Sequence, residues 1–251
     1  MSMQDMTVEL SGLSYGGFDR VDAPMVREHN RSISRADGRQ IGQQSALYVR
    51  WGFKRILDVV LASAILLFLL PAIPLILMAL IIQDGSPIMF RQNRLGKGGT
   101  TFPCLKFRSM CRDSEAKLRS LLESCDESRM EWSVTQKLRR DPRIHPVGAL
   151  LRKSSIDELP QLINVLKGEM SLVGPRPMLP EQAPMYGEKL CGYGSVRPGL
   201  TGLWQVSGRS ALTFEQRVDL DYTYATRVTF LGDLKILLRT VKVVFQFDGS
   251  C

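Results

Sequence analysis

The sequence predicts an α+β fold that is mainly helical, in which a helix-break-helix enters a membrane and returns, and a small α/β domain follows. Three observations predict this fold. One apolar run is long enough to enter a bilayer, residues 86–110 contain two strand-like segments around a glycine-rich turn, and most later segments have the apolar spacing of amphipathic helices. The 251 residues are enough for one large domain or two small ones beside the membrane segment.

The chain divides into three regions. Residues 1–45 are rich in Ser, Gly, Arg, Asp and Gln and lack a sustained apolar period, so we expect a flexible tail. They also lack the short apolar core and the cleavage site of a signal peptide. Residues 46–85 are expected to form the re-entrant membrane segment, and residues 86–251 the cytosolic domain.

The membrane segment is built on the apolar run from Ile56 to Ile82, in which only Asp58 is charged. A spanning helix needs about 20 apolar residues, so the run is long enough to enter a bilayer. Because the sequence holds one such run, it disfavours a channel or transporter, which normally needs several spans. We therefore expect a mostly soluble body that one segment attaches to a membrane.

Two prolines and the charges at both ends of the run predict that it turns back rather than crosses. Pro71 and Pro74 each lack a backbone donor, and proline inside a helix costs about 3 kcal/mol. Cytoplasmic flanks are rich in Lys and Arg. Here both flanks are basic, with Arg50, Lys54 and Arg55 before the run and Arg91, Arg94, Lys97, Lys106 and Arg108 after it. A re-entrant segment keeps both flanks in the cytosol, and a kinked spanning helix is the alternative.

Charge and cysteine content narrow the expected partners. The net charge of +8 fits a nucleic acid, an anionic lipid or a phosphorylated substrate. The sequence has no RNA-binding aromatic motif, zinc-finger spacing or basic-region heptads, so we expect lipid and a phosphorylated substrate and no nucleic acid. The five cysteines are an odd number without C-x-x-C spacing, which argues against a disulfide framework or a zinc site and favours a reducing compartment.

The cytosolic domain is predicted to hold one strand-turn-strand unit and several helices. Residues 86–110 fit two strands around the Gly-Lys-Gly-Gly turn at 96–99. Helices are predicted at 114–127, 148–153, 157–168 and 213–227, the last with Thr213 as its N-cap. Loops rich in Gly and Pro are predicted at 174–177, 197–202 and 206–210.

A final amphipathic helix is predicted at 230–247. One face carries apolar side chains: Leu231, Leu234, Leu238, Val241 and Phe245. A neighbouring stripe is basic: Lys235, Arg239 and Lys242. This arrangement fits a helix that lies in the headgroup layer of a membrane, and it fits a helix packed on a soluble core equally well.

The densest candidate for chemistry is the acidic pair Asp157-Glu158. One interpretation is structural, because Ser155 and Glu158 form the capping box S-x-x-E at a helix start. The other is functional: a helix N-terminus keeps a carboxylate ionised and attracts phosphates. Asp is an established covalent nucleophile, and an adjacent Glu suits a magnesium ion that also binds substrate phosphates.

Basic residues near this pair complete a phosphate site. Prolines on both sides keep Arg176 out of a helix, in the loop 174–177. A guanidinium binds phosphate through two parallel hydrogen bonds, and Lys106, Arg108 and Arg197 are further candidates. Each of them taken singly is also compatible with a solvated surface charge.

Other phosphate and sugar motifs are absent or weak in the sequence. GKGGTTF is not a P-loop, and no G-x-G-x-x-G follows a predicted strand. Asp219-Leu220-Asp221 has the acid-x-acid pattern of metal-dependent glycosyltransferases, but it falls inside a predicted helix. That class of enzyme is the enzymatic rival, and a non-catalytic membrane scaffold for polysaccharide assembly is the other alternative.

Three ordered blocks together resemble a known family: RQNRLGKGGTTFPCLKFRSM, DPRIHPVGALLRKSSIDELPQLINVLKGEMSLVGPRP and RPGLTGLWQVSGRS. They are similar to the bacterial sugar transferases called monotopic phosphoglycosyl transferases, or polyprenyl-phosphate hexose-1-phosphate transferases, of the exopolysaccharide-priming type. The resemblance runs from about residue 50 to the C-terminus and is far more specific than any single motif. It implies transfer of a sugar 1-phosphate from a nucleotide diphosphate sugar to a membrane polyprenyl phosphate.

The resemblance also implies roles for individual residues. Asp157 would attack the sugar-bearing phosphate, release UMP and carry the phosphosugar covalently, and Glu158 would bind Mg²⁺. Asp221, in a D-x-D-Y region, would assist. Four basic side chains would bind phosphate or nucleotide: Lys106, Arg108, Arg176 and Arg197. Undecaprenyl phosphate would then accept the phosphosugar in a second half-reaction.

The implied setting is the cytosolic face of the bacterial inner membrane, with a UDP-sugar as donor and membrane lipid as a partner. Galactose or glucose is favoured, an N-acetylated sugar is the alternative, and a homo-oligomer is left open. Many relatives carry Ser before the breaking proline, whereas this chain has Leu70 there and an additional Pro74. His145 also stands where a small polar residue is expected, and it receives no role.

Overall fold

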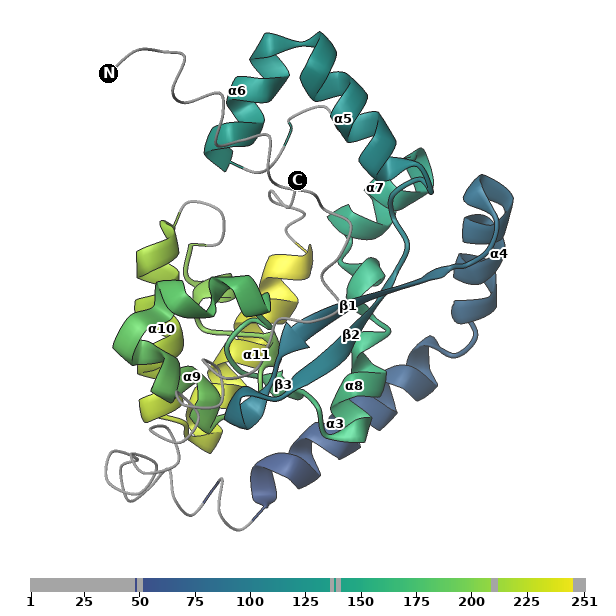
Figure 1. Cartoon of the computed structure of the whole chain (residues 1–251). Coiled ribbons are helices and arrows are strands. Elements are labelled where there is room, and N and C mark those ends of the chain that lie inside the picture. Colours follow the sequence, from purple (N-terminus) through teal and green to yellow (C-terminus); the bar gives the residue numbers. More distant parts are fainter. Residues whose placement is uncertain (1–47, 49–51, 136–137, 139–140, 209–211, 246–251) are drawn as a thin grey trace, which may run out of the picture.

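The fold is α+β, with many helices and small β-sheets (Figure 1). The computed structural model describes Tyr48 and residues 52–135, 138, 141–208 and 212–245. Up to the acidic pair the elements are α3 (Phe53–Leu69), α4 (Ile73–Asp84), β1 (Met89–Leu95), β2 (Thr101–Phe107), α5 (Ser114–Ser124), α6 (Asp126–Thr135) and α7 (Pro146–Lys153). After it come α8 (Gln161–Lys167), β3 (Ser171–Val173), α9 (Leu190–Ser195), β4 (Gly199–Thr201), α10 (Phe214–Thr226) and α11 (Phe230–Phe245). Short 3-10 helices cover Lys97–Gly99, Ile156–Glu158, Pro180–Lys189 and Trp204–Val206.

The apolar run forms two helices with a sharp break, as the prolines predict. Among the described residues no single helix is long and apolar enough to cross a membrane, whereas α3 and α4 together are, and they are bent by 67°. Pro71 lies in the break, and Pro74 lies in the first turn of α4, where the missing N–H would have no partner in any case. Figure 1 shows α4 at the edge of the molecule, and its side chains Leu75, Met78, Ile81 and Ile82 are exposed.

The strand-turn-strand prediction for residues 86–110 is confirmed. β1 pairs antiparallel with β2, from Met89 opposite Phe107 to Leu95 opposite Thr101. The turn needs glycine, because Gly98 and Gly99 have φ values of +68° and +74°. The hairpin places Lys106 near the end of β2, beside the acidic pair.

The prediction that residues 197–202 form a loop is wrong in part. Gly199–Thr201 form β4, which runs parallel to β3. The two backbones approach closely, since a Cβ on Gly199 would lie 2.1 Å from the nitrogen of Gly174. The glycines therefore allow close contact between two segments here, rather than marking a loop.

The predicted helices form with shifted ends. The segment 114–127 is interrupted at Cys125, which is extended, so its last residues begin α6. The segment 157–168 also divides, because a 3-10 turn precedes α8. The Thr213 cap is confirmed: its Oγ accepts from the Gln216 N–H, and the Gln216 side chain accepts from the Thr213 N–H.

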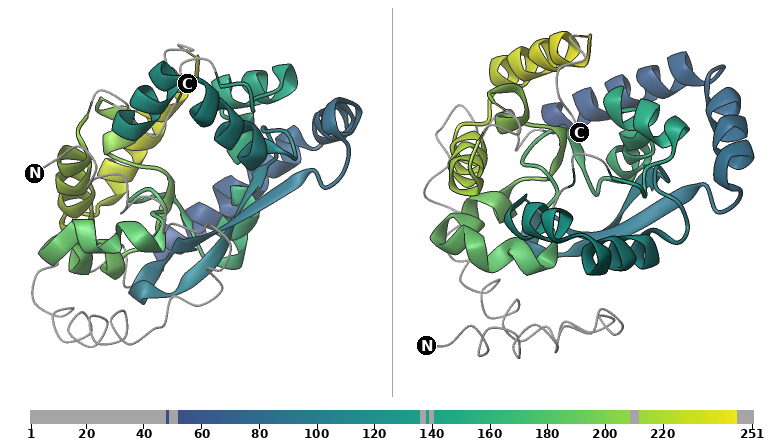
Figure 2. Two further views of the ribbon diagram at one scale, coloured as in Figure 1. Left: turned by 45° about the horizontal axis from the view of Figure 1, so that its top comes forward. Right: turned by 90° about the horizontal axis from the view of Figure 1, so that it is seen from above.

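The main core lies where α3, α8, β3, α10 and α11 meet. Its fully buried side chains include Leu162, Val165 and Met170, and α11 contributes Ile236. The apolar face predicted for the last helix does not pack on this core. Its described members Leu231, Leu234, Leu238 and Val241 are 40–64% exposed, and the side chain of Phe245 lies outside the description. In the right-hand view of Figure 2, α11 and α3 lie along the upper side of the molecule, and α4 runs down its right-hand edge.

Candidate active site

The acidic pair lies in a 3-10 turn between α7 and α8. Ser155, which precedes the turn, has φ +58°, and its side chain makes no capping hydrogen bond. The capping-box interpretation is therefore wrong. The reason is tertiary: Glu158 points to cationic groups from other segments instead of returning to the backbone.

Glu158 is held by two cations that come from different parts of the chain. Its Oε1 accepts from Lys106 Nζ at 2.7 Å and from Arg176 Nη2 at 3.0 Å. Burial alone would raise the pKa of Glu158, but the charges of Arg176 and Lys106 outweigh burial and lower that pKa to about 2. Glu158 is consequently ionised at any physiological pH.

Asp157 lies next to this ion-pair cluster and is almost buried, with 8% of its surface exposed. Burial raises the pKa of Asp157 and the neighbouring Glu158 charge raises it further, while Lys106, Arg152 and Arg176 oppose the rise. The helix N-terminus therefore does not lower the pKa of Asp157, whereas Glu158 is ionised as predicted for a carboxylate of this pair. The pair precedes α8 by several residues, so desolvation outweighs the helix dipole.

The loop that carries Arg176 has the predicted irregular form and follows β3 directly. The parallel pairing of β3 with β4 anchors the loop, and the Gly174 N–H donates to the Thr201 carbonyl at 2.9 Å. The side chain of Arg176 is 39% exposed. A cation that is partly open to solvent on an anchored backbone suits a phosphate ligand.

The strand that carries Lys106 is anchored to α8 by a residue that sequence reasoning missed. Asn164 is fully buried, its Oδ1 accepts from the Leu105 N–H at 3.0 Å, and its Nδ2 donates to the Pro103 carbonyl at 2.9 Å. The available signal was an Asn between Ile163 and Val165 in the apolar part of the predicted helix 157–168, because a polar side chain buried there needs hydrogen-bond partners. Arg152 on α7 was also missed, although it precedes Asp157 by five residues; its charge acts on Asp157, and its Nε donates to Ser109 Oγ.

Two of the predicted basic ligands contact other groups. Arg108 pairs with the Asp84 carboxylate at 3.1 Å and donates to the Gly85 carbonyl at the end of α4. Arg197 donates to the Gly168 carbonyl at the end of α8. The structure therefore brings Lys106 and Arg176 to the acidic pair, and it places Arg108 and Arg197 at helix C-termini, where cations complement the dipole.

Asp221 and Asp219 have different environments. Asp221 is 1% exposed, and its Oδ2 accepts from the Tyr186 hydroxyl at 3.0 Å. Burial raises the pKa of Asp221 to about 7, while the Tyr186 hydrogen bond and the Arg176 charge oppose the rise. Asp219 is exposed and pairs with Lys189. One carboxylate is in the core and the other on the surface, so this arrangement does not present an acid-x-acid metal site.

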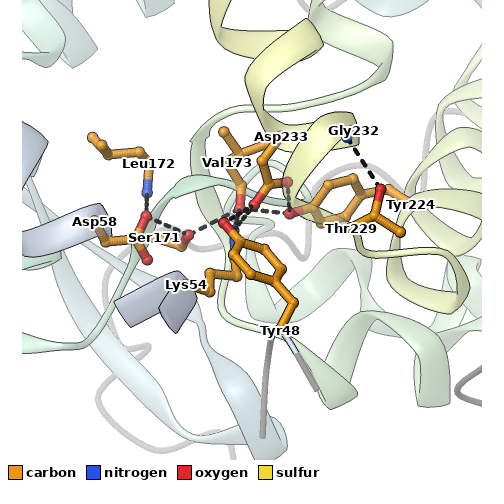
Figure 3. Close-up of polar contacts among 10 residues, drawn as sticks. All are labelled: Tyr48, Lys54, Asp58, Ser171, Leu172, Val173, Tyr224, Thr229, Gly232 and Asp233. Carbon is orange, nitrogen blue, oxygen red and sulfur yellow. Dashed lines mark hydrogen bonds and ion pairs between the residues drawn. The ribbon is translucent and has the colours of Figure 1, made fainter. Parts of the chain in front are cut away.

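A buried polar network attaches α3 and α11 to β3, three residues before Arg176 (Figure 3). Lys54 Nζ lies 2.6 Å from Asp233 Oδ2 and donates to the Val173 carbonyl at 3.0 Å. The Tyr224 hydroxyl lies within hydrogen-bond distance of the same carbonyl and of Asp233 Oδ1. Asp58, also on α3, accepts from the Leu172 N–H at 2.9 Å. Two of the three charged residues of α3, Lys54 and Asp58, are thereby buried against the strand that leads into the loop of Arg176.

The described residues contain no group of three or more His, Cys, Asp or Glu side chains that could hold a metal ion by themselves. Magnesium often binds through one or two carboxylates together with substrate phosphates, and Asp157 and Glu158 match that donor set in kind. As arranged, however, Glu158 is already neutralised by Lys106 and Arg176. The pair does not fit a metal ion that binds alone.

Comparison with known proteins gives a match over most of the chain. A family model described as bacterial sugar transferase matches residues 49–247. The undecaprenyl-phosphate galactose phosphotransferase of Salmonella typhimurium is 44% identical over 197 residues, which are 78% of this chain and 41% of that protein. The exopolysaccharide production protein ExoY of Sinorhizobium fredii is 41% identical over 197 residues, 78% of this chain and 87% of that protein.

A third relative is the UDP-glucose:undecaprenyl-phosphate glucose-1-phosphate transferase of Caulobacter vibrioides. It is 39% identical over 206 residues, which are 78% of this chain and 71% of that protein. The chain thus spans about two fifths of the length of some relatives and most of the length of others.

Proposed function

The chain belongs to the bacterial sugar transferase family, and on this premise we propose that it transfers a hexose 1-phosphate from a UDP-sugar to undecaprenyl phosphate. The observation that carries the proposal is the buried carboxyl group of Asp157 beside Glu158, Lys106 and Arg176. The names of the Salmonella and Caulobacter relatives support the same donor and acceptor classes.

In the proposed first half-reaction, the carboxylate of Asp157 attacks the phosphorus that bears the sugar. The bond from that phosphorus to the bridging oxygen breaks, UMP leaves, and an aspartyl phosphosugar remains. In the second half-reaction a phosphate oxygen of undecaprenyl phosphate attacks the same phosphorus. The Asp157–phosphorus bond then breaks, and undecaprenyl diphosphate sugar is released with the enzyme carboxylate restored.

The basic side chains would serve the charge of the reacting phosphates. Lys106 on β2 and Arg176 in the loop after β3 both donate to Glu158, and the charge of Arg152 acts on Asp157. Donors of this kind stabilise charge that develops on phosphate oxygens, with no reorganisation of solvent in the reaction. The raised pKa of Asp157 means that the free enzyme holds more of the inactive protonated form than an exposed Asp would, and this reduces its reactivity at low pH.

We also propose Mg²⁺ as the cofactor, with Glu158 as its protein ligand and donor phosphates as the others. Bound there, the ion would neutralise phosphate charge during transfer. This role requires Glu158 to be free of its two cations.

The proposed location is the cytosolic face of the inner membrane. The bend of 67° between α3 and α4 and the exposed apolar side chains on both helices support a re-entrant segment. In the right-hand view of Figure 2, helix α11 lies along the same side of the molecule as α3. Its exposed apolar side chains are accompanied on the helix by the exposed Lys235, Arg239 and Lys242. We propose that α11 lies in the headgroup layer, where this combination of side chains is favoured.

The donor sugar is proposed to be galactose or glucose, the two sugars that the relatives' names contain. The decisive experiment incubates the full chain with undecaprenyl phosphate and a panel of UDP-sugars, N-acetylated ones included, and identifies the nucleotide released. UMP is expected. Release of UDP would overturn the proposal in favour of the metal-dependent glycosyltransferase.

A matched pair of variants separates catalysis from a scaffold role. Asp157→Asn keeps the shape of the side chain but removes the nucleophile, so we expect UMP release to fall by at least about a thousandfold. Asp219→Asn makes the same chemical change at an exposed residue and is expected to retain activity. A scaffold protein would keep its function with either substitution.

A further inference from the structure

Glu158 forms ion pairs with Lys106 and Arg176, the two cations that are proposed to bind the donor's phosphate. Its Oε1 accepts charge-assisted hydrogen bonds from Lys106 at 2.7 Å and from Arg176 at 3.0 Å. These are the distances that a phosphate oxygen would adopt with the same two groups. The carboxylate and a phosphate therefore compete for one position.

The same contacts disfavour a metal ion at Glu158. A divalent cation at this carboxylate would lie beside two positive groups, and one oxygen of the carboxylate already accepts from both. A phosphate oxygen at the position of Oε1, in contact with both cations, therefore requires the ion pairs to open.

The ion pairs are arranged so that they can open. The side chains of Glu158, Lys106 and Arg176 are 18%, 23% and 39% exposed, so water and anions reach them. The backbones behind the two cations are anchored, on one side by Asn164 and on the other by the β3–β4 pairing. Exchange of partners therefore needs only side-chain movement.

We propose that Glu158 is an internal stand-in for the donor's phosphate. In the free protein the Glu158 carboxylate pairs with Lys106 and Arg176, and the phosphate of the donor displaces it from these two cations on binding. This inference rests on the proposed function for the identity of the ligand. Phosphate oxygens take over the two cations, and the freed carboxylate becomes available to a divalent cation only at that point. The free protein consequently has little affinity for metal, and metal binding depends on the donor.

The first test measures phosphate binding without metal. The probe is UMP, titrated by calorimetry into the 251-residue protein in detergent with EDTA. Glu158→Gln removes the competing charge, so we expect UMP to bind about tenfold more tightly than to the unchanged protein. Asp219→Asn, which removes one exposed negative charge elsewhere, is the matched control and should leave UMP affinity unchanged. Equal or weaker binding to Glu158→Gln would overturn the inference.

The second test measures metal binding without nucleotide, with Mn²⁺ as the probe and the loss of the free-ion signal in electron paramagnetic resonance as the readout. Lys106→Met should tighten Mn²⁺ binding about tenfold, and combining it with Glu158→Gln should cancel the gain. Lys97→Met removes a charge from the exposed turn of the same hairpin and should have no effect. Unchanged Mn²⁺ affinity in Lys106→Met would refute the stand-in role.

These two tests are independent of the proposed reaction. If UMP binds to none of the proteins and no UDP-sugar yields UMP, the proposed function fails, while the Mn²⁺ titrations still decide whether Glu158 is held by its two cations. If UMP is released but both titrations show no change, the function stands and the stand-in role is wrong.

Discussion

Replacing Lys54 by methionine tests the buried network that joins α3 to β3 and α11. The ammonium lies 2.6 Å from Asp233, whose surface is 1% exposed, and it also donates to the Val173 carbonyl. The substitution keeps most of the side-chain volume but leaves a buried carboxylate without its cation. Removing one partner of a buried ion pair costs about 3–5 kcal/mol.

The expected loss is large enough to measure by thermal unfolding. For a chain of this size each kcal/mol lowers Tm by about 2–4 °C, so Lys54→Met should lower Tm by about 6–20 °C. The assay follows intrinsic tryptophan fluorescence of the detergent-solubilised protein during heating, with Lys97→Met as the surface control. The double variant Lys54→Met with Asp233→Asn removes both charges and should recover part of the loss.

Two results would refute this reasoning. A change in Tm below about 2 °C for Lys54→Met would mean that water or the neighbouring tyrosines stabilise Asp233 without the lysine. A double variant as unstable as the sum of the single variants would mean that the two charges do not interact.

Three further predictions follow from the fold. Burial raises the pKa of Asp221 to about 7, so the folded state holds a proton that the unfolded state loses near pH 4. The contribution of Asp221 to the free energy of unfolding is therefore complete below about pH 4. It falls by up to about 4 kcal/mol as the pH rises through 7. Asp221→Asn should remove that fall in Tm between pH 5 and pH 8, and an unchanged slope would contradict the assignment. Gly174→Ala would place a Cβ 2.4 Å from the Arg197 carbonyl, so UMP release should fall at least about tenfold and Tm should drop; a variant with normal activity would show that the strands separate easily. Cysteines introduced at positions 50 and 91, in a background without native cysteines, should both label from the cytosolic side, and labelling from opposite sides would establish a spanning helix.

The features that the sequence predicts well are those set by neighbouring residues. The hairpin follows from alternation around Gly98 and Gly99, the break between α3 and α4 from Pro71, and the start of α10 from Thr213. In each case the determining atoms lie within a few residues of one another. Local steric rules and local hydrogen bonds are therefore sufficient.

The features that were missed depend on partners far away in the chain. The S-x-x-E pattern at Ser155 is compatible with a cap, yet Glu158 pairs with Lys106, which lies 52 residues earlier. β4 is a strand because its backbone meets β3, and a three-residue strand rich in glycine carries no periodic signal. The burial that raises the pKa of Asp157 is likewise a property of the assembled fold.

The resemblance of the ordered sequence blocks predicts which residues far apart in the chain belong to one site, and apolar periodicity does not. It groups the acidic pair with Lys106 and Arg176, and the structure brings both cations into contact with Glu158 of that pair. It places Arg108 and Arg197 in the same group, whereas the structure puts those two at helix ends. Sequence blocks indicate which residues occur together in a family, and contact distances show which of them share a partner.

The network around Lys54 also has a consequence for the order in which the protein is made. Asp233 follows Lys54 by 179 residues, and the Leu172 N–H that binds Asp58 follows that carboxylate by 114. At about 5–20 residues per second, a ribosome needs about 9–36 s to supply Asp233 after Lys54. Lys54 and Asp58 are therefore synthesised well before their partners on α11 and β3, and the Lys54–Asp233 ion pair can form only after α11 has left the ribosome.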